Sequence, residues 1–146
     1  MTYLLDTDTV TLLREGHGTV SNRVLTSPVG TVGTSVITLE ESLSGWYTLI
    51  RKAKTRERAA QAYLELVRTA QFFGRIPVAT YSTDAMAKYD SLKRASLNVA
   101  KNDLRIAAIA LLTGATVITR NVRDFRRVPD LHVEDWSLPL DNRPQL

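Results

Sequence analysis

Short apolar segments typical of buried strands alternate along this chain with longer segments of helical periodicity. The segment ATVIT at residues 115–119 is rich in β-branched residues, as expected of a strand buried on both faces. Farther up the chain, Leu39, Leu43 and Trp46 recur at the spacing of one helix face. Strands that alternate with helices form parallel sheets, and right-handed crossovers place helices on both faces of such a sheet. The alternation therefore predicts an α/β fold, a three-layer α/β/α sandwich with a mainly parallel central sheet.

Capping residues and glycines mark the expected ends of these elements. We expect strands over residues 3–5, 32–37, 76–80, 115–119 and 131–134. We expect helices over residues 7–15, from Thr38 as the cap through residue 50, over 55–73, over 83–95, and from Asn102 or Asp103 to residue 113. One domain is expected over residues 1–136, followed by a short irregular tail over 137–146 that is interrupted by prolines.

Composition narrows the class of protein. The chain has 146 residues and no cysteine, which excludes disulfides, thiolate metal sites and a cysteine nucleophile. No apolar run approaches the roughly 20 residues of a membrane helix, and an acid already stands at position 6, so we expect a cytoplasmic protein with neither a membrane span nor a secretory signal. A net charge of +4 and a pI near 9.6 permit a nucleic-acid partner without requiring one.

Acidic residues follow several of the expected strands or begin the helices after them. They are, in chain order, Asp6, the pair Glu40 and Glu41, Asp103 and Asp124. The carboxyl ends of parallel strands meet at one edge of an open sheet, where ligand sites lie. Two carboxylates about 4 Å apart repel by roughly 4 kcal/mol at an effective dielectric near 20, whereas a helix N-terminus stabilises one by only about 0.3–1 kcal/mol. Such a cluster therefore takes up protons or binds a cation, and oxygen ligands favour Mg²⁺ or Mn²⁺.

Each of these acids also has an ordinary structural explanation. Asp6 and Asp103 suit helix caps. Glu40 and Glu41 suit the first turn of a helix, where the macrodipole favours negative charge. Asp124 lies within TRNVRDFRR and could pair with a neighbouring arginine on the surface. It is their joint placement after successive strands that favours a shared site.

Four segments resemble, in order, motifs of the PIN-domain ribonucleases, specifically the VapC-like toxins of bacterial type II toxin–antitoxin pairs. LLDTDTV at 4–10 resembles the family's opening hydrophobic-Asp-Thr-Asn/Asp segment, and SVITLEESLSG at 35–45 resembles its Ser-x-Ile-Thr-x-x-Glu motif. NDLRIAAIAL at 102–111 resembles the Asp-x-x-Ile-Ala-Ala helix, and VITRNVRDF at 117–125 resembles the closing Thr-x-Asp/Asn-x-x-x-Phe segment. The resemblance implies a PIN-like nuclease domain over residues 1–136 in which Asp6, Glu41 (rather than Glu40) and Asp103 bind the metal.

One departure from the family pattern concerns the fourth acidic position. Many family members carry an aspartate where this chain has Asn121, whose carbonyl can accept a contact but brings no charge. Members that resemble initiator-tRNA cleavers often carry the same asparagine with an acid just before the phenylalanine, which is Asp124 here. The resemblance therefore assigns Asp124 part of the fourth acid's catalytic role, and places Asp8, Thr119 and Asn121 in support of the ligands.

The activity that this resemblance implies is Mg²⁺-dependent hydrolysis of RNA, with Mn²⁺ as a substitute metal. Asp6, Asp103 and Glu41 would hold the ion, which lowers the pKa of an attacking water and offsets charge at the phosphorus. The TRNVRDF variant suggests a tRNA substrate. The family further implies a cognate VapB-like antitoxin, whose C-terminal segment occupies the acidic groove, and a homodimer.

Basic and aromatic residues complete the set of candidates. A basic group beside the last motif is expected to hold RNA phosphates; it consists of Arg120, Arg123, Arg126 and Arg127. Other basic clusters are expected to be solvated surface. The aromatic residues expected in the core or at a dimer interface are Trp46, Trp136, Phe72 and Phe73.

Two other functions fit parts of the sequence. YLLDTDTV also resembles the opening of haloacid-dehalogenase-like phosphatases, in which Asp6 would be the nucleophile and Asp8 a general acid. Against this alternative, the closing region lacks that family's paired acids and the chain is short for a core plus a cap. A degenerate PIN domain that binds RNA or a partner without cleavage is the other alternative, and Asn121 is the feature that favours it.

Overall fold

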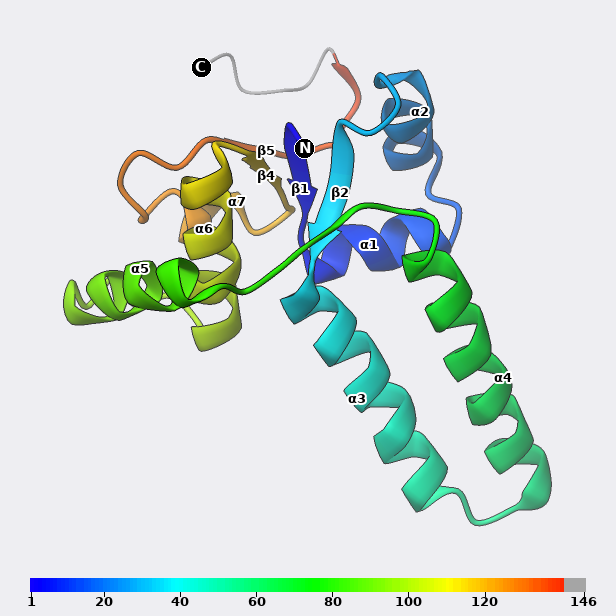
Figure 1. The fold of residues 1–146 in the computed structure, drawn as a ribbon. Coiled ribbons are helices and arrows are strands. Elements are labelled where there is room, and N and C mark those ends of the chain that lie inside the picture. Colours follow the sequence, from blue (N-terminus) through cyan, green and yellow to red (C-terminus); the bar gives the residue numbers. More distant parts are fainter. Residues whose placement is uncertain (141–146) are drawn as a thin grey trace.

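The computed structural model describes residues 1–140 and contains one five-stranded sheet, in which every pair of neighbouring strands is parallel (Figure 1). The strands lie in the order β3-β2-β1-β4-β5. Their bounds are β1 (Tyr3–Leu5), β2 (Val32–Ser35), β3 (Val78–Ala79), β4 (Thr116–Ile118) and β5 (Val133–Glu134). The predicted α/β/α class is confirmed, and β1 lies at the centre of the sheet.

Seven helices among the described residues surround this sheet. Their bounds are α1 (Thr7–Arg14), α2 (Gly18–Thr26), α3 (Val36–Lys52), α4 (Arg56–Phe73), α5 (Thr83–Arg94), α6 (Lys101–Thr113) and α7 (Val122–Phe125). The long helices α3 and α4 form a hairpin that extends beyond the sheet (Figure 1). None of the helices within residues 1–140 combines the length and the apolar character that crossing a membrane requires.

Two separate hydrophobic cores lie on the two faces of the sheet. Leu4 in β1 packs with residues of α5 and α6, whereas the next residue, Leu5, packs with residues of α1 and α2. Both leucines are fully buried, and burial of such a side chain contributes about 1.5–3 kcal/mol. Alternate residues of a strand point to opposite faces, so the short apolar strand β1 packs against the helices on both faces of the sheet. The predicted core residues Phe73 and Trp136 are buried in the second of these cores.

The start of α3 differs from the prediction. Strand β2 ends at Ser35 rather than at residue 37, and the Ser35 hydroxyl, not that of Thr38, caps the helix by accepting a hydrogen bond from the Thr38 amide at 3.3 Å. Thr38 instead lies fully buried inside the first turn. The β-branched run of residues 36–38 indicates a strand by propensity, and the buried cap at Ser35 overrides that propensity.

Several other predicted boundaries are also wrong by a few residues. Neither Asn102 nor Asp103 opens α6, because the helix begins at Lys101 after Ala100, which makes no side-chain cap. Asp103 therefore lies within the first turn. The strands predicted over 76–80, 115–119 and 131–134 are shorter than expected, at two, three and two residues.

Two helices were not predicted at all. In α2, the imidazole Nδ1 of His17 accepts a hydrogen bond from the Val20 amide at 3.4 Å, so His17 is the cap. Gly16, directly before this cap, has a positive φ of 79°, which separates α1 from α2. The short α7 follows β4 directly and carries Asp124. The predicted tail begins among described residues, at Ser137, and its residues 141–146 lie outside the described part of the chain.

Candidate functional site

Asp6 lies at the carboxyl end of the central strand β1 and is nearly buried, with 5 % of its surface exposed. Its Oδ1 accepts a hydrogen bond from the Thr9 amide at 2.8 Å and thereby caps α1. Burial raises the pKa of Asp6, while hydrogen bonds from Thr119 and Thr9 oppose that rise. The predicted cap and the predicted site residue are thus the same side chain, and one of its oxygens is committed to the cap.

Asp103, in the first turn of α6, is electrostatically coupled to the other predicted acids. Burial, followed by the negative charges of Asp6 and Glu41, raises its pKa to about 6. Asp124 adds a smaller increase, whereas a hydrogen bond from Asn121 acts in the opposite direction. The structure therefore brings four carboxylates from α1's cap, α3, α6 and α7 to the same edge of the sheet.

Glu41 faces this edge from α3. Its Oε1 accepts a hydrogen bond from the Thr7 hydroxyl at 2.9 Å, and the Thr7 and Thr38 hydroxyls are 3.0 Å apart. Glu40, the neighbouring acid, is exposed. The register implied by the family motif thus places the partly buried glutamate, rather than the exposed one, beside α1.

Asn121 connects two of the acids. Its side-chain amide donates to Asp124 Oδ2 at 3.0 Å and to Asp103 Oδ2 at 3.4 Å. Its backbone amide donates to the Thr119 hydroxyl at 2.9 Å, and Thr119 is fully buried. An amide between two carboxylates reduces their repulsion, since it offers N–H donors to both.

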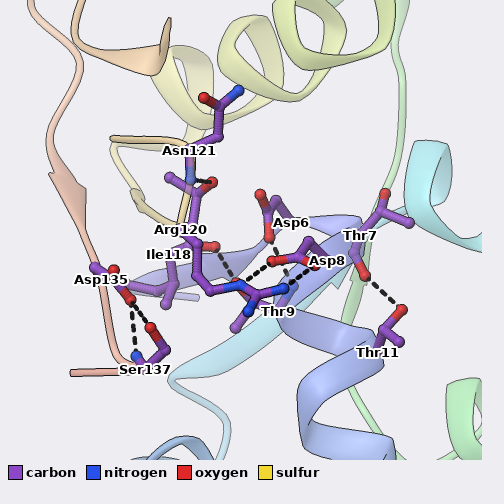
Figure 2. A network of polar contacts seen from close by, with 11 residues as sticks. Asp6, Thr7, Asp8, Thr9, Thr11, Ile118, Arg120, Asn121, Asp135 and Ser137 are labelled. Atoms are coloured by element: carbon purple, nitrogen blue, oxygen red, sulfur yellow. Dashed lines mark hydrogen bonds and ion pairs between the residues drawn. The ribbon is translucent and has the colours of Figure 1, made fainter. Parts of the chain in front are cut away.

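Asp8 and Arg120 form an ion pair at the rim of this cluster (Figure 2). The guanidinium donates from Nε to Asp8 Oδ2 at 2.6 Å and from Nη2 to Asp8 Oδ1 at 2.7 Å. The hydrogen bonds from Arg120 lower the pKa of Asp8. Asp8 therefore contacts Arg120, among the described residues, rather than the acids that it was predicted to support.

The remaining arginines of the predicted RNA-binding group differ in their surroundings. Arg127 donates to the backbone carbonyl of Asn98 at 2.7 Å and lies 3.1 Å from Asp124. Arg123 and Arg126 are exposed on and beside α7. The four arginines share the α7 region, but Arg127 is used within the protein.

A groove of about 970 Å³ adjoins the acidic cluster, between α1, α3 and α4. Thr7 and Glu41 belong to both the groove and the cluster. Its walls include Trp46 and Phe72, which were predicted as core or interface residues, and Arg14, whose guanidinium lies 5.6 Å from the Phe72 ring centre. The sequence does not predict this groove, because no motif relates α1 to α4.

The donor set suits a hard divalent cation, because all its candidate ligands are carboxylate oxygens and their mutual repulsion is strong enough to shift a pKa. Within residues 1–140, however, no three acidic or histidine side chains are already arranged to hold one ion. Glu41 is held by Thr7, and Asp124 by Asn121. One oxygen of each of these two side chains is therefore already used by a hydrogen bond within the protein.

Comparison with known proteins agrees with the sequence resemblance. Residues 3–131 match the PIN domain. Ribonuclease VapC2 of Rickettsia felis is 29% identical, with 94% of this chain and 99% of that protein covered. Ribonuclease VapC1 of Haemophilus influenzae is 26% identical over the same shares of the two chains.

Solved structures give the same result. A VapBC structure from Salmonella typhimurium, bound to DNA, matches with a TM-score of 0.75 and 26% identity, covering 93% of this chain and 98% of that one. VapBC-1 from nontypeable Haemophilus influenzae matches with a TM-score of 0.74 and 26% identity, covering 94% and 100%. The family match includes strands β1 to β4 and every acidic residue of the cluster, and the chain therefore belongs to the PIN-domain family.

Proposed function

We propose that this protein is a Mg²⁺-dependent endoribonuclease and the toxin of a VapBC-type toxin–antitoxin pair. The observation that carries the proposal is the meeting of Asp6, Glu41 and Asp103 at one edge of a PIN-family sheet, where burial together with the charges of Asp6 and Glu41 raises the pKa of Asp103 to about 6. Repulsion of this kind is relieved when a divalent cation is bound. The similar VapC proteins, which are named ribonucleases, support the choice of RNA as substrate.

In this mechanism the acids hold the metal and orient the water. Asp6 and Asp103 would bind the ion through the oxygens that face the cluster, and Glu41 would turn from Thr7 to complete the ligands or to accept a hydrogen bond from the attacking water. When bound, Mg²⁺ supplies a water of lowered pKa and offsets negative charge on the phosphate. Thr119 and Thr9 keep Asp6 oriented by hydrogen bonds.

The fourth acidic position is shared in this proposal. Asp124 supplies the charge, and Asn121 holds it beside Asp103 through its amide. Because Asp124 also contacts Arg127, it would act through a water rather than as a direct ligand. Arg120, Arg123 and Arg126 would hold phosphates of the RNA strand.

Substrate and partners follow from the relatives. The tRNA(fMet)-specific endonuclease VapC of Salmonella typhimurium is 33% identical over 44% of this chain, which supports a tRNA substrate. The similar structures of VapBC proteins support a VapB-like antitoxin as partner. The groove beside Glu41 would receive the antitoxin's C-terminal segment, and the toxin would form a homodimer.

The decisive experiment incubates purified protein with total RNA, with and without Mg²⁺, and maps the cleaved ends. We expect metal-dependent cleavage in the wild type and a loss of about 100-fold or more in Asp6→Asn and Asp103→Asn, since each removes a charged ligand. Asparagine is itself a good helix cap, so Asp6→Asn retains the start of α1. Glu57→Gln, at the exposed far end of the α3–α4 hairpin, is the matched control and should cleave normally.

Other outcomes would contradict the proposal in recognisable ways. Intact RNA together with no Mn²⁺ binding in calorimetry would indicate a PIN domain that binds without cleavage. A phospho-aspartate on Asp6 during turnover would indicate a phosphatase of the haloacid-dehalogenase type.

A further inference from the structure

Two charged side chains at the rim of the acidic cluster hold each other in a fixed geometry. Arg120 and Asp8 are 112 residues apart in the sequence and meet through two hydrogen bonds of 2.6 and 2.7 Å (Figure 2). Arg120 directly follows the buried Thr119, and Asp8 is the second residue after the buried Asp6. The pair therefore bridges the carboxyl ends of the neighbouring strands β1 and β4.

Stability alone does not account for this arrangement. The side chains of Arg120 and Asp8 are 51% and 46% exposed, so water contacts the pair and weakens its contribution to folding. The pair does fix the guanidinium, because two parallel N–H···O bonds define both its position and its plane. A guanidinium has five N–H groups, of which Asp8 uses two, so three remain for another acceptor.

The position of this cation relates it to the proposed reaction. Arg120 lies close enough to Asp6 and Asp135 for their charges to act on it. Asp6 is buried at the strand end beside the Arg120–Asp8 pair (Figure 2), so a phosphate drawn to an ion at Asp6 would come near the guanidinium of Arg120. Arg127 is placed differently, since it is bonded to the Asn98 carbonyl and to Asp124.

We infer that Arg120 binds a phosphate oxygen of the RNA strand next to the cleaved bond, and that Asp8 is the positioning residue that orients its guanidinium. This inference rests on the proposed function and goes further by giving the two residues one joint role. It also reassigns Asp8, which acts through Arg120 rather than through the metal ligands.

The test compares steady-state RNA cleavage by Arg120→Gln, Asp8→Asn and the double variant, with Arg58→Gln as control. Arg58 is exposed in the first turn of α4. This turn lies at the end of the α3–α4 hairpin that is remote from the sheet (Figure 1), and Arg58→Gln removes the same charge as Arg120→Gln. We expect Arg120→Gln to raise KM about tenfold, as for loss of one charge-assisted hydrogen bond, with kcat little changed. In Arg120→Gln the slope of the logarithm of the RNA-binding constant against the logarithm of salt concentration should be smaller in magnitude by about 0.7, as for loss of one phosphate contact on a single strand.

Asp8→Asn should raise KM about threefold and keep the wild-type salt dependence, because the charge of Arg120 remains while its orientation is lost. In the double variant KM should equal that of Arg120→Gln alone, since Asp8 then has no cation to orient. Arg120→Lys should restore the salt dependence but not KM. A pair with only a structural role would instead lower the melting temperature equally in both single variants and leave KM unchanged, which would overturn the inference.

The failure of this inference can be separated from failure of the proposed function. Anisotropy of a fluorescein-labelled single-stranded RNA is measured in an Asp103→Asn background, where no cleavage is required. Weaker binding with a reduced salt slope in Arg120→Gln, but not in Arg58→Gln, supports the inference even if the wild type cleaves no RNA. Equal binding by these two variants overturns it even if cleavage by the wild type is confirmed.

Discussion

Asn121 is a neutral side chain bonded to two of the acids, and its effect on them can be predicted. Its amide donates to both Asp103 and Asp124, so Asn121→Asp would replace a shared donor by a further negative charge. We expect the metal-free variant to lose about 1–2 kcal/mol of unfolding free energy, since two acceptors lose their partner and gain a like charge. With Mn²⁺ present, Asn121→Asp should instead be more stable than the wild type, because the added carboxylate binds the ion more tightly. Thermal unfolding with and without Mn²⁺, together with calorimetry, measures both effects.

The control for this prediction is Asn98→Asp, which adds the same charge to a loop outside the cluster. Asn98 contributes its backbone carbonyl, not its side chain, to the contact with Arg127. If Asn121→Asp and Asn98→Asp changed stability and Mn²⁺ affinity alike, the proposed role of Asn121 would be excluded.

At the residue scale, sequence motifs predicted which acids meet but not what their neighbours do. Asp6 and Asp103 could be chosen because each stands at a fixed place relative to a strand or helix. The contact between Asp8 and Arg120 could not be predicted, because it depends on strands β1 and β4 being adjacent in the sheet. Local sequence does not indicate the order of the strands. The contact of Asn121 with Asp103 likewise depends on tertiary packing, of α6 beside the residues that follow β4.

The junction between β2 and α3 shows how one buried cap governs an element. Ser35 is fully buried and accepts the Thr38 amide, so Ser35→Ala leaves that amide without a partner in the core. We expect the free energy of unfolding to fall by about 2 kcal/mol, the upper end of the range for cap removal. Denaturant unfolding followed by circular dichroism measures this change.

The matched control is Thr55→Ala, which removes the cap of α4. Thr55 is exposed, so water replaces its hydroxyl at the Arg58 amide and the cost should be only about 0.5 kcal/mol. Equal losses in the two variants would show that burial of the Ser35 cap has no special importance.

Helices with a clear periodicity were predicted well, and elements set by capping or tertiary contacts were not. The bounds predicted for α4 and α5 are nearly those of the structure, because each has a hydroxyl cap directly before an amphipathic run. Helix α2 was missed because its cap is His17, a residue that rarely caps helices, and because its first residue is a glycine. Strand β1 has its predicted bounds, but the lengths of the other four strands were overestimated, because β propensity extends beyond the residues that actually pair.

At the scale of the whole molecule, folding itself forces the acids together. Asp6 is carried by the central strand, Glu41 by the hairpin helix α3, and Asp103 by α6, which belongs to the core on the other face of the sheet. None of these carboxylates is near the others in the unfolded chain. Their repulsion therefore lowers the stability of the metal-free fold, and the loss should depend on pH.

The pH dependence of metal-free stability has a definite sign. Asp103 has a pKa of about 6 in the folded protein against an ordinary value of 3.8, so between these two pH values the folded state binds more protons than the unfolded chain. Its contribution is unfavourable above pH 6 and disappears as the pH falls toward 3.8. Since Asp103 is partly exposed, we expect Asp103→Asn to gain only about 1 kcal/mol at pH 7, or about 3 °C in Tm. The gain should vanish near pH 4, where the wild-type carboxyl is protonated.

Thermal unfolding of both proteins in EDTA from pH 4 to pH 8 measures this difference, and Asp90→Asn, at an exposed position of α5, controls for the loss of one charge. Adding Mg²⁺ at pH 7 should raise the melting temperature of the wild type above that of Asp103→Asn, because only the wild type keeps the ligand. The wild type and Asp103→Asn would follow parallel curves if Asp103 were a solvated residue of the α6 first turn. A difference that appears on raising the pH and reverses on adding Mg²⁺ requires instead that the charge of Asp103 be disfavoured by burial and by the neighbouring acids, and that a bound ion balance it.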